Sequence, residues 1–590
     1  MKLKIYKIIF LFLILVINYS YSQIAPDNKT INSMADLKKK SYLYKNNSKN
    51  VNFSGNNYDV KYHRFNWYID PDTFYIKGSV TTYFTAKADK ISEIEFELNS
   101  LLVVDSVTQK GIKINFNHGI NSNDIIKITL NDSLALNSLD SLTIYYKGVP
   151  VNSTGLGSFT QSYHGINKDK PVIWTLSEPY GCKDWWPCKQ SLNDKIDSID
   201  IIIKTPKQFR VVANGLLVTE ILADPFKIYH WKHKYPIAAY LIAFAVSDYI
   251  VFSEFAATGQ GQSDIIEIQN YVYPEDTTET INQTEITIPV MQFFCNKFSP
   301  YPFKKEKYGH CQIGWDGGME HQTMTFLGVF NFEIIAHELA HSWFGNMITH
   351  SSWPDLWLNE GFATYLTGLC YENIFPDHYY WNIWKQMKIN HITSKPDGSV
   401  YVTDTINIDK LFDPRLVYNK GAMILHTLRW VMGDADFYNA IHNYLNNNNL
   451  TYNFAKFSDF KTHCETASSK DLTYFFDDWY YGEGYPIYDI NVIKNSDDSL
   501  NIIFNQSQSH NSVSFFKLPV ALKFKNQSKD TTLIFNNISN HQTFKTKLSF
   551  LPDSIFFDPD NWLIAKANIS IINNIDDTFP ISSVSIYPNP

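Results

Sequence analysis

The stretch IIAHELAHSWFGN, Ile334 to Asn346, places three titratable side chains in a segment that otherwise has the apolar pattern of a buried helix. His337 and His341 are four residues apart, so on a helix their imidazoles lie about 6 Å from each other on one face. Glu338 follows the first histidine and lies close to the point on which the rings converge. Two neutral nitrogen donors at this spacing suit zinc, and the adjacent carboxylate can accept a proton from water activated by the metal.

A third ligand is expected from the next helix. Gly345 can end the first helix, and Pro354 can begin another, which carries LWLNEGFATYL. Eighteen residues separate His341 from Glu360, enough chain for an antiparallel return. Two histidines and one glutamate leave a fourth position for water, as in catalytic rather than structural zinc sites. The sequence therefore predicts one catalytic Zn²⁺ per chain, held by these two histidines and Glu360, with Glu338 as the base.

The 590-residue chain is too long for one hydrophobic core and is expected to form several domains. After a polar lead-in over 23–56, short alternating strands predict a β domain over 57–250. Helical spacing dominates 251–484, with helices expected at 333–345, 356–371, 415–432 and 435–446. Alternation returns over 485–567 and predicts a small β-sandwich, followed by a linker at 568–590. The predicted fold class is multidomain α+β.

Charge and cysteine usage exclude some functions. The net charge is -8 and no basic tract occurs, which argues against nucleic acid as a partner. The six cysteines show neither the spacing of a zinc ribbon nor the density of a disulfide scaffold. Cys182 and Cys188 could form a disulfide or remain buried thiols, and the sequence leaves both open.

The N-terminus has the features of an export signal. Lys2, Lys4 and Lys7 precede the apolar run Ile8–Ile17, and SYS at 20–22 offers small residues at a cleavage site. This pattern predicts a signal peptide over 1–22, with cleavage before Gln23. The apolar run is shorter than the roughly 20 residues that cross a membrane, and no later segment is apolar enough. We expect a secreted or cell-surface protein without a transmembrane segment.

Four stretches together resemble the aminopeptidase N family of zinc metallopeptidases, peptidase family M1. HELAHSWFGN…WLNEGFATYL has the family's HExxH, eighteen residues and Glu, and WDGGMEHQTMTFL (315–327) is similar to its GxMEN exopeptidase motif. FFDDWYYGEGYP (475–486) resembles the segment that ends the catalytic domain, and TLSEPYGCKDWWPC (175–188) resembles the stretch by which the N-terminal domain reaches the active site. The resemblance covers about residues 58–567. It implies an N-terminal β-sheet saddle domain, a thermolysin-like, mostly helical catalytic domain and a β-sandwich, without the C-terminal helical domain.

The resemblance also implies a site for the N-terminus of a peptide. Glu320 would bind the α-ammonium through a charge-assisted hydrogen bond, and Glu178 would supply a second contact. Gly317 and Gly318 would let the substrate backbone approach, and Met319 would contribute to the S1 pocket.

Two further positions follow from the resemblance. Tyr418, in VYNKGAMILH, would stabilise the oxyanion. His321 stands where the family usually has Asn, and an imidazole there is expected to vary in charge near neutral pH.

The predicted function is a secreted zinc aminopeptidase acting on peptides with a free N-terminus. One alternative is a thermolysin-type zinc endopeptidase, which needs no group to bind the substrate amine. Another is a non-catalytic surface adhesin or glycan-binding protein that has kept the fold.

The C-terminal SVSIYPNP resembles the opening of the sorting domain used in bacterial type IX secretion, which would make that machinery a partner. The alternative is an ordinary strand and turn.

Overall fold

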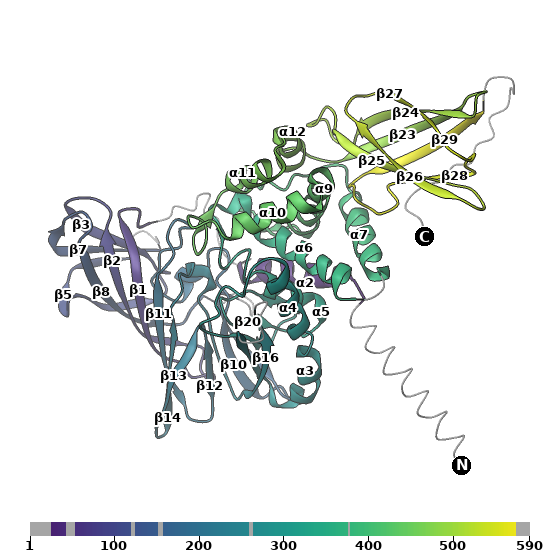
Figure 1. Ribbon diagram of the computed structural model, residues 1–590. Coiled ribbons are helices and arrows are strands. Elements are labelled where there is room, and N and C mark those ends of the chain that lie inside the picture. Colours follow the sequence, from purple (N-terminus) through teal and green to yellow (C-terminus); the bar gives the residue numbers. More distant parts are fainter. Residues whose placement is uncertain are drawn as a thin grey trace, which may run out of the picture.

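The computed structural model describes residues 25–42, 54–119, 124–151, 157–258, 264–375 and 378–573. The predicted signal peptide and the SVSIYPNP tail lie outside these residues. Figure 1 shows three regions in a row: an N-terminal region of strands, a central region rich in helices, and a second region of strands. The predicted multidomain α+β class is confirmed.

The N-terminal region is a β domain because its strands alternate buried and exposed side chains, as one-sided sheets require. Along β1, Tyr58, Val60, Phe65 and Trp67 are all buried. The described strands form an eight-stranded sheet in the order β13-β14-β11-β1-β2-β8-β4-β5, a four-stranded sheet β12-β15-β10-β9 and a three-stranded sheet β3-β7-β6.

Their bounds are β1 (Tyr58–Tyr68), β2 (Ile76–Ala86), β3 (Ile91–Glu97), β4 (Val103–Gln109), β5 (Ile112–Ile114), β6 (Phe116–His118), β7 (Ile125–Leu134), β8 (Leu139–Gly148), β9 (Phe159–His164), β10 (Lys170–Thr175), β11 (Ser198–Pro206), β12 (Arg210–Ala213), β13 (Leu216–Ala223), β14 (Phe226–His233) and β15 (Phe244–Ser247).

The central region begins with a five-stranded sheet in the order β16-β17-β18-β20-β19, and α4 and α5 pack against it. Its strands are β16 (Ile250–Ala257), β17 (Ile265–Val272), β18 (Tyr308–Gln312), β19 (Gly318–Met319) and β20 (Thr325–Leu327), with the short pair β21 (Thr349–His350) and β22 (Phe454–Ala455) further on.

The helices of this region are α3 (Thr277–Thr284), α4 (Thr287–Lys297), α5 (Phe332–Ala340), α6 (Trp357–Asn373), α7 (Tyr379–Ile392), α8 (Ile408–Leu411), α9 (Gly421–Met432), α10 (Asp434–Leu445), α11 (Phe457–Ser468) and α12 (Thr473–Phe476). Two π-helices, Pro414–Lys420 and Asp477–Tyr481, complete the helical part. None of the described helices has the length and apolar character needed to cross a membrane.

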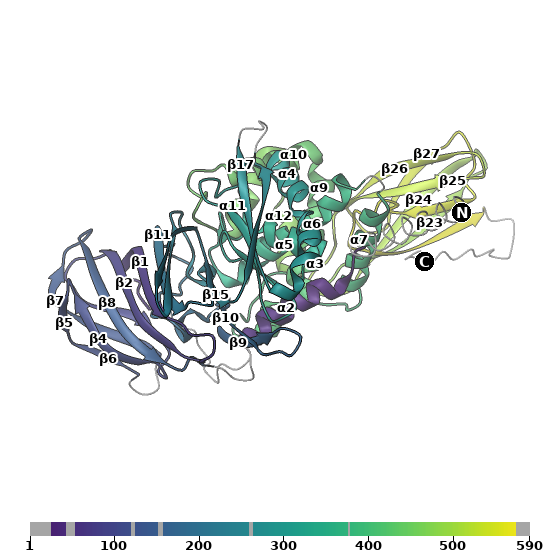
Figure 2. The same cartoon turned by 90° about the horizontal axis from the view of Figure 1, so that it is seen from below.

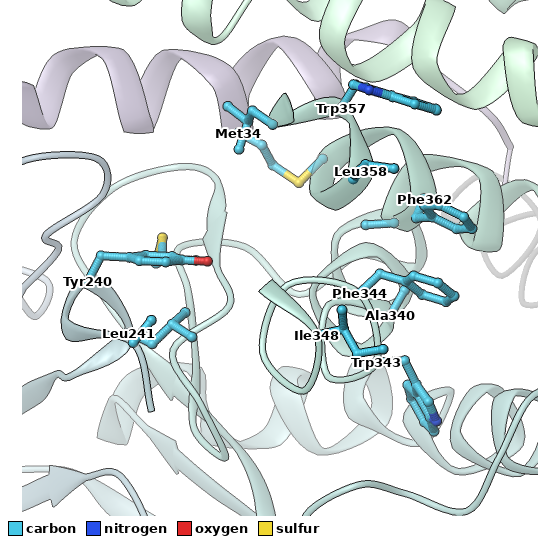
Figure 3. Close-up of a cluster of buried hydrophobic side chains, with 14 of the residues drawn as sticks. Met34, Tyr240, Leu241, Ala340, Trp343, Phe344, Ile348, Trp357, Leu358 and Phe362 are labelled. Atoms are coloured by element: carbon cyan, nitrogen blue, oxygen red, sulfur yellow. The ribbon is translucent and has the colours of Figure 1, made fainter. Parts of the chain in front are cut away.

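The core of the central region is aromatic. Figure 3 shows Trp343, Phe344, Trp357 and Phe362 in one buried cluster. The rings of Phe344 and Phe362 stack with centroids 4.0 Å apart, which holds the segment after α5 against α6. This packing fixes the relative positions of the two elements that carry the predicted metal ligands.

The last region is a sandwich of a four-stranded sheet, β27-β24-β23-β29, and a three-stranded sheet, β26-β25-β28. The strands are β23 (Pro486–Lys494), β24 (Ser499–Gln508), β25 (Leu518–Lys525), β26 (Asp530–Asn537), β27 (Gln542–Lys547), β28 (Ser554–Phe557) and β29 (Lys566–Asn573). Cys182 and Cys188 are both buried and both free in this structure, as are the other four cysteines.

The lead-in over 23–56 differs from the prediction. Residues Asn28–Tyr42 form the helix α2 instead of a loose segment. Its first turn is capped by Asp27, whose carboxylate accepts a hydrogen bond of 2.8 Å from the Thr30 amide. Ile31, Met34 and Leu37 are buried on one face. An amphipathic face and a cap therefore outweigh the polar composition of this segment.

Candidate metal centre and amine-binding site

α5 and α6 bring the three predicted metal ligands together. Asn331 caps α5 by accepting a hydrogen bond of 2.9 Å from the Ile334 amide. His337 Nε2 lies 3.0 Å from Glu360 Oε2, and His341 Nε2 lies 3.4 Å from the same oxygen. All three side chains are buried, and one donor atom of each lies within 4.8 Å of the others. Two nitrogens and one oxygen at this separation fit a zinc ion.

The orientation of His341 depends on a residue that the sequence analysis did not identify. His341 Nδ1 is 2.9 Å from Asn359 Oδ1 and 3.1 Å from the Phe344 carbonyl oxygen, so this nitrogen carries the hydrogen. Nε2 is therefore the nitrogen that faces Glu360, and it can donate a lone pair to a metal once its proton is lost. The sequence did contain a sign of this role, because Asn359 directly precedes the predicted metal ligand Glu360.

The helix that carries the histidines is shorter than predicted. It was expected to reach residue 345, but α5 ends at Ala340 and irregular turns follow. Gly345 has a φ of 134°, and a Cβ atom there would lie 2.0 Å from Asn359 Oδ1. Glycine at this position therefore lets Asn359 approach His341, and that approach requires the helix to end early.

Glu338 is positioned as a base. The side chain is buried, and the described residues offer no hydrogen-bond partner to either carboxylate oxygen. It lies against β19, because a Cβ atom on Gly318 would be 2.4 Å from Glu338 Oε1. Burial raises its pKa well above the usual range. A carboxylate with a raised pKa holds a proton more readily than an exposed one, which suits a general base.

The charge of the site favours a cation. Burial lowers the pKa of His337 to about 4, which keeps this ring neutral and able to donate a lone pair. Burial acts in the same direction on His341, but the carboxylates of Glu320 and Glu360 outweigh it and raise its pKa to about 10. This opposite shift reflects the negative charge gathered around the two rings.

A second set of carboxylates lies beside the metal ligands. Glu178, from the N-terminal domain, and Glu320, next to β19, approach Glu360 so that one oxygen of each lies within 4.8 Å of the others. The ammonium of Lys38, on α2, contacts all three: Nζ is 2.8 Å from Glu178 Oε2, 3.0 Å from Glu320 Oε2 and 2.6 Å from Glu360 Oε1. No motif in the polar lead-in marks Lys38 as a site residue.

The remaining predicted residues surround this centre. The Tyr418 hydroxyl, on the π-helix Pro414–Lys420, donates a hydrogen bond of 3.0 Å to Glu360 Oε1. Gly318 and Met319 form β19 and are buried. Gly317 precedes them and lies directly beneath α2, since a Cβ there would be 3.1 Å from the Ser33 carbonyl oxygen.

His321 differs from the expectation that its charge would vary near neutral pH. Its side chain is buried against Phe326, with ring centroids 4.4 Å apart. Neither ring nitrogen has a hydrogen-bond partner among the described residues. Burial lowers its pKa to about 3, so the imidazole is neutral at physiological pH.

Two family models match the chain. The "Peptidase M1 N-terminal domain" matches residues 55–241, and the "Peptidase family M1 domain" matches residues 283–479, which include every predicted metal ligand. The chain belongs to peptidase family M1. The family implied by the sequence motifs is thereby confirmed.

Curated members of the family align with the chain at low identity. Aminopeptidase M1-A of Oryza sativa subsp. japonica is 25% identical over 440 residues, covering 70% of this chain and 48% of that protein. Glutamyl aminopeptidase of Rattus norvegicus is 27% identical over 395 residues, covering 62% and 40%. Leucyl aminopeptidase of Saccharolobus solfataricus is 24% identical over 376 residues, covering 60% and 46%. The chain thus spans about half the length of these relatives or less.

Solved structures share the fold. An M1 zinc metallopeptidase from Deinococcus radiodurans superposes with a TM-score of 0.57 at 22% identity, covering 70% of this chain and 92% of that chain. A mutant of the same enzyme, bound to Tyr-Ser-Ala, gives a TM-score of 0.59 at 22% identity, covering 73% and 95%. The order of the N-terminal β domain and the helical domain is common to both.

Proposed function

We propose that this M1 protein is a zinc-dependent aminopeptidase that removes N-terminal residues from peptides. The observation that carries this proposal is the division of Glu360 between two tasks. Its Oε2 faces His337 and His341, while its Oε1 is 2.6 Å from a primary ammonium that Glu178 and Glu320 also contact. A metal position and an ammonium position therefore adjoin through one carboxylate. An enzyme that acts beside a free N-terminus needs this arrangement, and an endopeptidase does not.

The side chains divide the reaction among them. Zn²⁺, held by His337, His341 and Glu360, would supply Lewis acidity at the scissile carbonyl and lower the pKa of water. Glu338 accepts the proton of the attacking water and then delivers it to the leaving amine.

The other groups hold the substrate. Glu320 and Glu178 bind the α-ammonium, which fixes the first peptide bond relative to the base. The Tyr418 hydroxyl lies beside the metal ligands, 3.0 Å from Glu360 Oε1, and would donate a hydrogen bond to the developing oxyanion.

The metal and amine requirements can be tested separately with the zinc-loaded protein. Aminoacyl-arylamides should be hydrolysed, and 1,10-phenanthroline should abolish the activity until Zn²⁺ is restored. N-acetylation of the substrate should remove nearly all turnover, and Glu320→Gln should weaken the preference for a free amine by about tenfold or more. Equal cleavage of acetylated peptides would favour a thermolysin-type endopeptidase. Absence of hydrolysis by every variant with zinc bound would favour a non-catalytic role.

We also propose that the protein is exported. Residues 1–22 support this through their three lysines and apolar run, and SVSIYPNP supports a type IX route by its resemblance to a sorting domain. Protein recovered from the culture medium should begin at Gln23. Retention in the cytoplasm with an intact Met1 would contradict export.

A further inference from the structure

α2 covers the site that the proposed reaction requires. It packs against α8 and against α5, β19 and the π-helix Pro414–Lys420, and these last three carry the base, part of the exopeptidase motif and Tyr418. Figure 2 shows it as the purple helix that runs along the edge of the helical region. Its inner face includes Met34 and Leu37, both fully buried, and Figure 3 shows Met34 pointing toward the interior near Leu358 of α6.

The backbone of α2 blocks the edge on which a substrate would lie. The Ser33 carbonyl oxygen and the Leu37 Cβ would be 3.1 and 3.2 Å from a Cβ on Gly317, so the helix covers the first residue of GGMEH. If Gly317 and β19 receive the substrate backbone, α2 and a peptide cannot both occupy this position.

Lys38 occupies the amine position itself. Its ammonium is within 3.0 Å of carboxylate oxygens of Glu178, Glu320 and Glu360. A substrate α-ammonium would need the same three oxygens. Lys38 therefore has the chemistry of a substrate amine, but its ammonium is attached to a side chain and presents no adjacent peptide bond for cleavage.

This contact is compatible with a bound metal. Lys38 contacts more carboxylates than one ammonium can neutralise, so negative charge remains for a divalent cation. Lys38 uses Glu360 Oε1, whereas the imidazoles face Oε2. The lysine therefore competes with the substrate amine for Glu360 and leaves the metal-binding oxygen free.

The outer face of α2 is held less tightly. Its polar contacts there include Lys39 to Asp409 at 3.7 Å and Lys40 Nζ above the Trp315 ring, 4.6 Å from the ring centroid. A cavity of about 400 Å³ separates part of the helix from the loop before β19, lined by Ser33, Asp36, Lys40, Gly314, Trp315 and Asp316. The shortest ion pairs of α2 are those of Lys38, at 2.6 to 3.0 Å, and they lie on the same side as its buried apolar residues.

We propose that α2 is an autoinhibitory segment, in which Lys38 fills the amine site and the helix backbone covers β19, so that activity requires its displacement or removal. This inference rests on the proposed aminopeptidase function. It assigns α2 a role that a purely structural helix would not need, because burying a lysine among three carboxylates stabilises a fold less than apolar packing does.

The first test compares full-length, zinc-loaded variants on an aminoacyl-arylamide. Lys38→Met keeps the aliphatic part of the side chain and removes the charge. The double variant Met34→Asp with Leu37→Asp places charges on the buried apolar face of α2 and should displace the helix. Both should raise kcat/KM at least tenfold over wild type. Lys29→Ala, an exposed lysine on the same helix, is the matched control and should leave kcat/KM unchanged. Equal activity of wild type and both unseating variants would overturn the proposal.

The second test does not depend on turnover. In the zinc-loaded Glu338→Gln background, calorimetry measures binding of a tripeptide with a free N-terminus and of its N-acetyl form. Adding Lys38→Met should tighten binding of the free tripeptide at least tenfold, with little effect on the acetylated one. Saturating tripeptide should also speed hydrogen exchange of α2 amides, because the displaced helix loses its protection.

The two tests separate two kinds of failure. If no variant hydrolyses the arylamide but Lys38→Met tightens tripeptide binding, the aminopeptidase proposal fails and the inhibitory contact stands. If the tripeptide binds Glu338→Gln and Glu338→Gln/Lys38→Met equally, the inhibitory contact is refuted even in an active enzyme.

Discussion

Lys189 in the N-terminal β domain and Lys38 on α2 are both buried lysines, but their surroundings differ. Lys189 Nζ contacts one carboxylate, Asp194 Oδ2 at 2.7 Å, and the Tyr58 carbonyl oxygen at 2.9 Å. Asp194 in turn accepts a hydrogen bond of 3.0 Å from the Val60 amide. Lys38 contacts three carboxylates. The first lysine forms a balanced pair, whereas the second enters a cluster with excess negative charge.

The carboxylates of the two regions differ in degree, because Asp194 has one oxygen without a hydrogen-bond partner among the described residues and Glu338 has two. In the β domain, buried Glu97 accepts hydrogen bonds from the Ser54 amide and the Gln190 side chain. In the cleft, neither oxygen of Glu338 has a hydrogen-bond partner among the described residues. Burying an unsatisfied charge is costly, so a fold tolerates it only where another demand overrides stability. The comparison indicates that charges in the β domain serve folding and those in the cleft serve a ligand.

Among substitutions that test this difference between the two regions, Glu338→Gln should have the largest effect on kcat. The amide is similar in shape but cannot accept the proton, so kcat should fall by about 10³-fold or more. The zinc content should stay at that of the parent, because Glu338 is not a ligand. Steady-state kinetics in the Lys38→Met background and metal analysis measure the two quantities.

Stability should respond in the opposite direction to kcat. Removing an unsatisfied buried carboxylate should leave the thermal midpoint of Glu338→Gln equal to that of the parent or above it. A marked loss of stability would show that Glu338 serves the fold, and the distinction between the two regions would fail.

Lys189→Met makes the reciprocal test in the β domain. It leaves Asp194 buried without its ammonium partner, and the free energy of unfolding should fall by about 3 kcal/mol. The kcat of the folded enzyme should not change. Urea unfolding followed by tryptophan fluorescence gives the stability, and Lys189→Met with Asp194→Asn should recover part of the loss because both charges are then absent.

The sequence could predict that His337, His341 and Glu360 lie together, because this geometry is mostly local. A spacing of four residues places His337 and His341 on one face of a helix. A short antiparallel return of the chain is then enough to place Glu360 beside them. The segment after His341 could not be predicted in detail, because the close approach of Asn359 to Gly345 depends on packing between two elements. The neutrality of His321 likewise follows from burial that only the folded structure shows.

α2 was missed for a different reason. The composition of 23–56 is rich in Asn, Lys and Ser, and no motif marks it. A signal was nevertheless present, since Asp27 can cap the helix and Ile31, Met34 and Leu37 recur at intervals of three. That Lys38 reaches Glu320, 282 residues away in the chain, could not be derived from local pattern.

Tyr418→Phe should have a smaller effect than the change at Glu338. Loss of the hydroxyl removes a donor to the oxyanion, and kcat should fall by about 10²-fold with little change in KM. Since the hydroxyl also donates to Glu360 Oε1, zinc affinity is measured in parallel. A weaker zinc affinity with normal kcat at saturating zinc would make Tyr418 a positioning residue for Glu360.

The smallest expected effect is on the pH dependence of stability, and it concerns His63, a buried histidine whose surroundings differ from those of His341. His63 on β1 has a hydrogen bond of 2.9 Å between Nδ1 and Thr82 Oγ1, and burial lowers its pKa to about 3. The cleft carboxylates have the opposite effect on His341, whose pKa they raise to about 10.

Between pH 6.5 and 3 the unfolded chain binds a proton that the native β domain excludes at His63, so stability falls as pH falls through this window. At pH 5 the contribution is about 2 kcal/mol. His63→Asn retains a polar group for Thr82 and cannot titrate, so its stability relative to wild type should improve by that amount between pH 7.5 and pH 5. Urea midpoints at both pH values measure the change, and parallel pH profiles for the two proteins would show that His63 is protonated in the native β domain or does not control its acid stability.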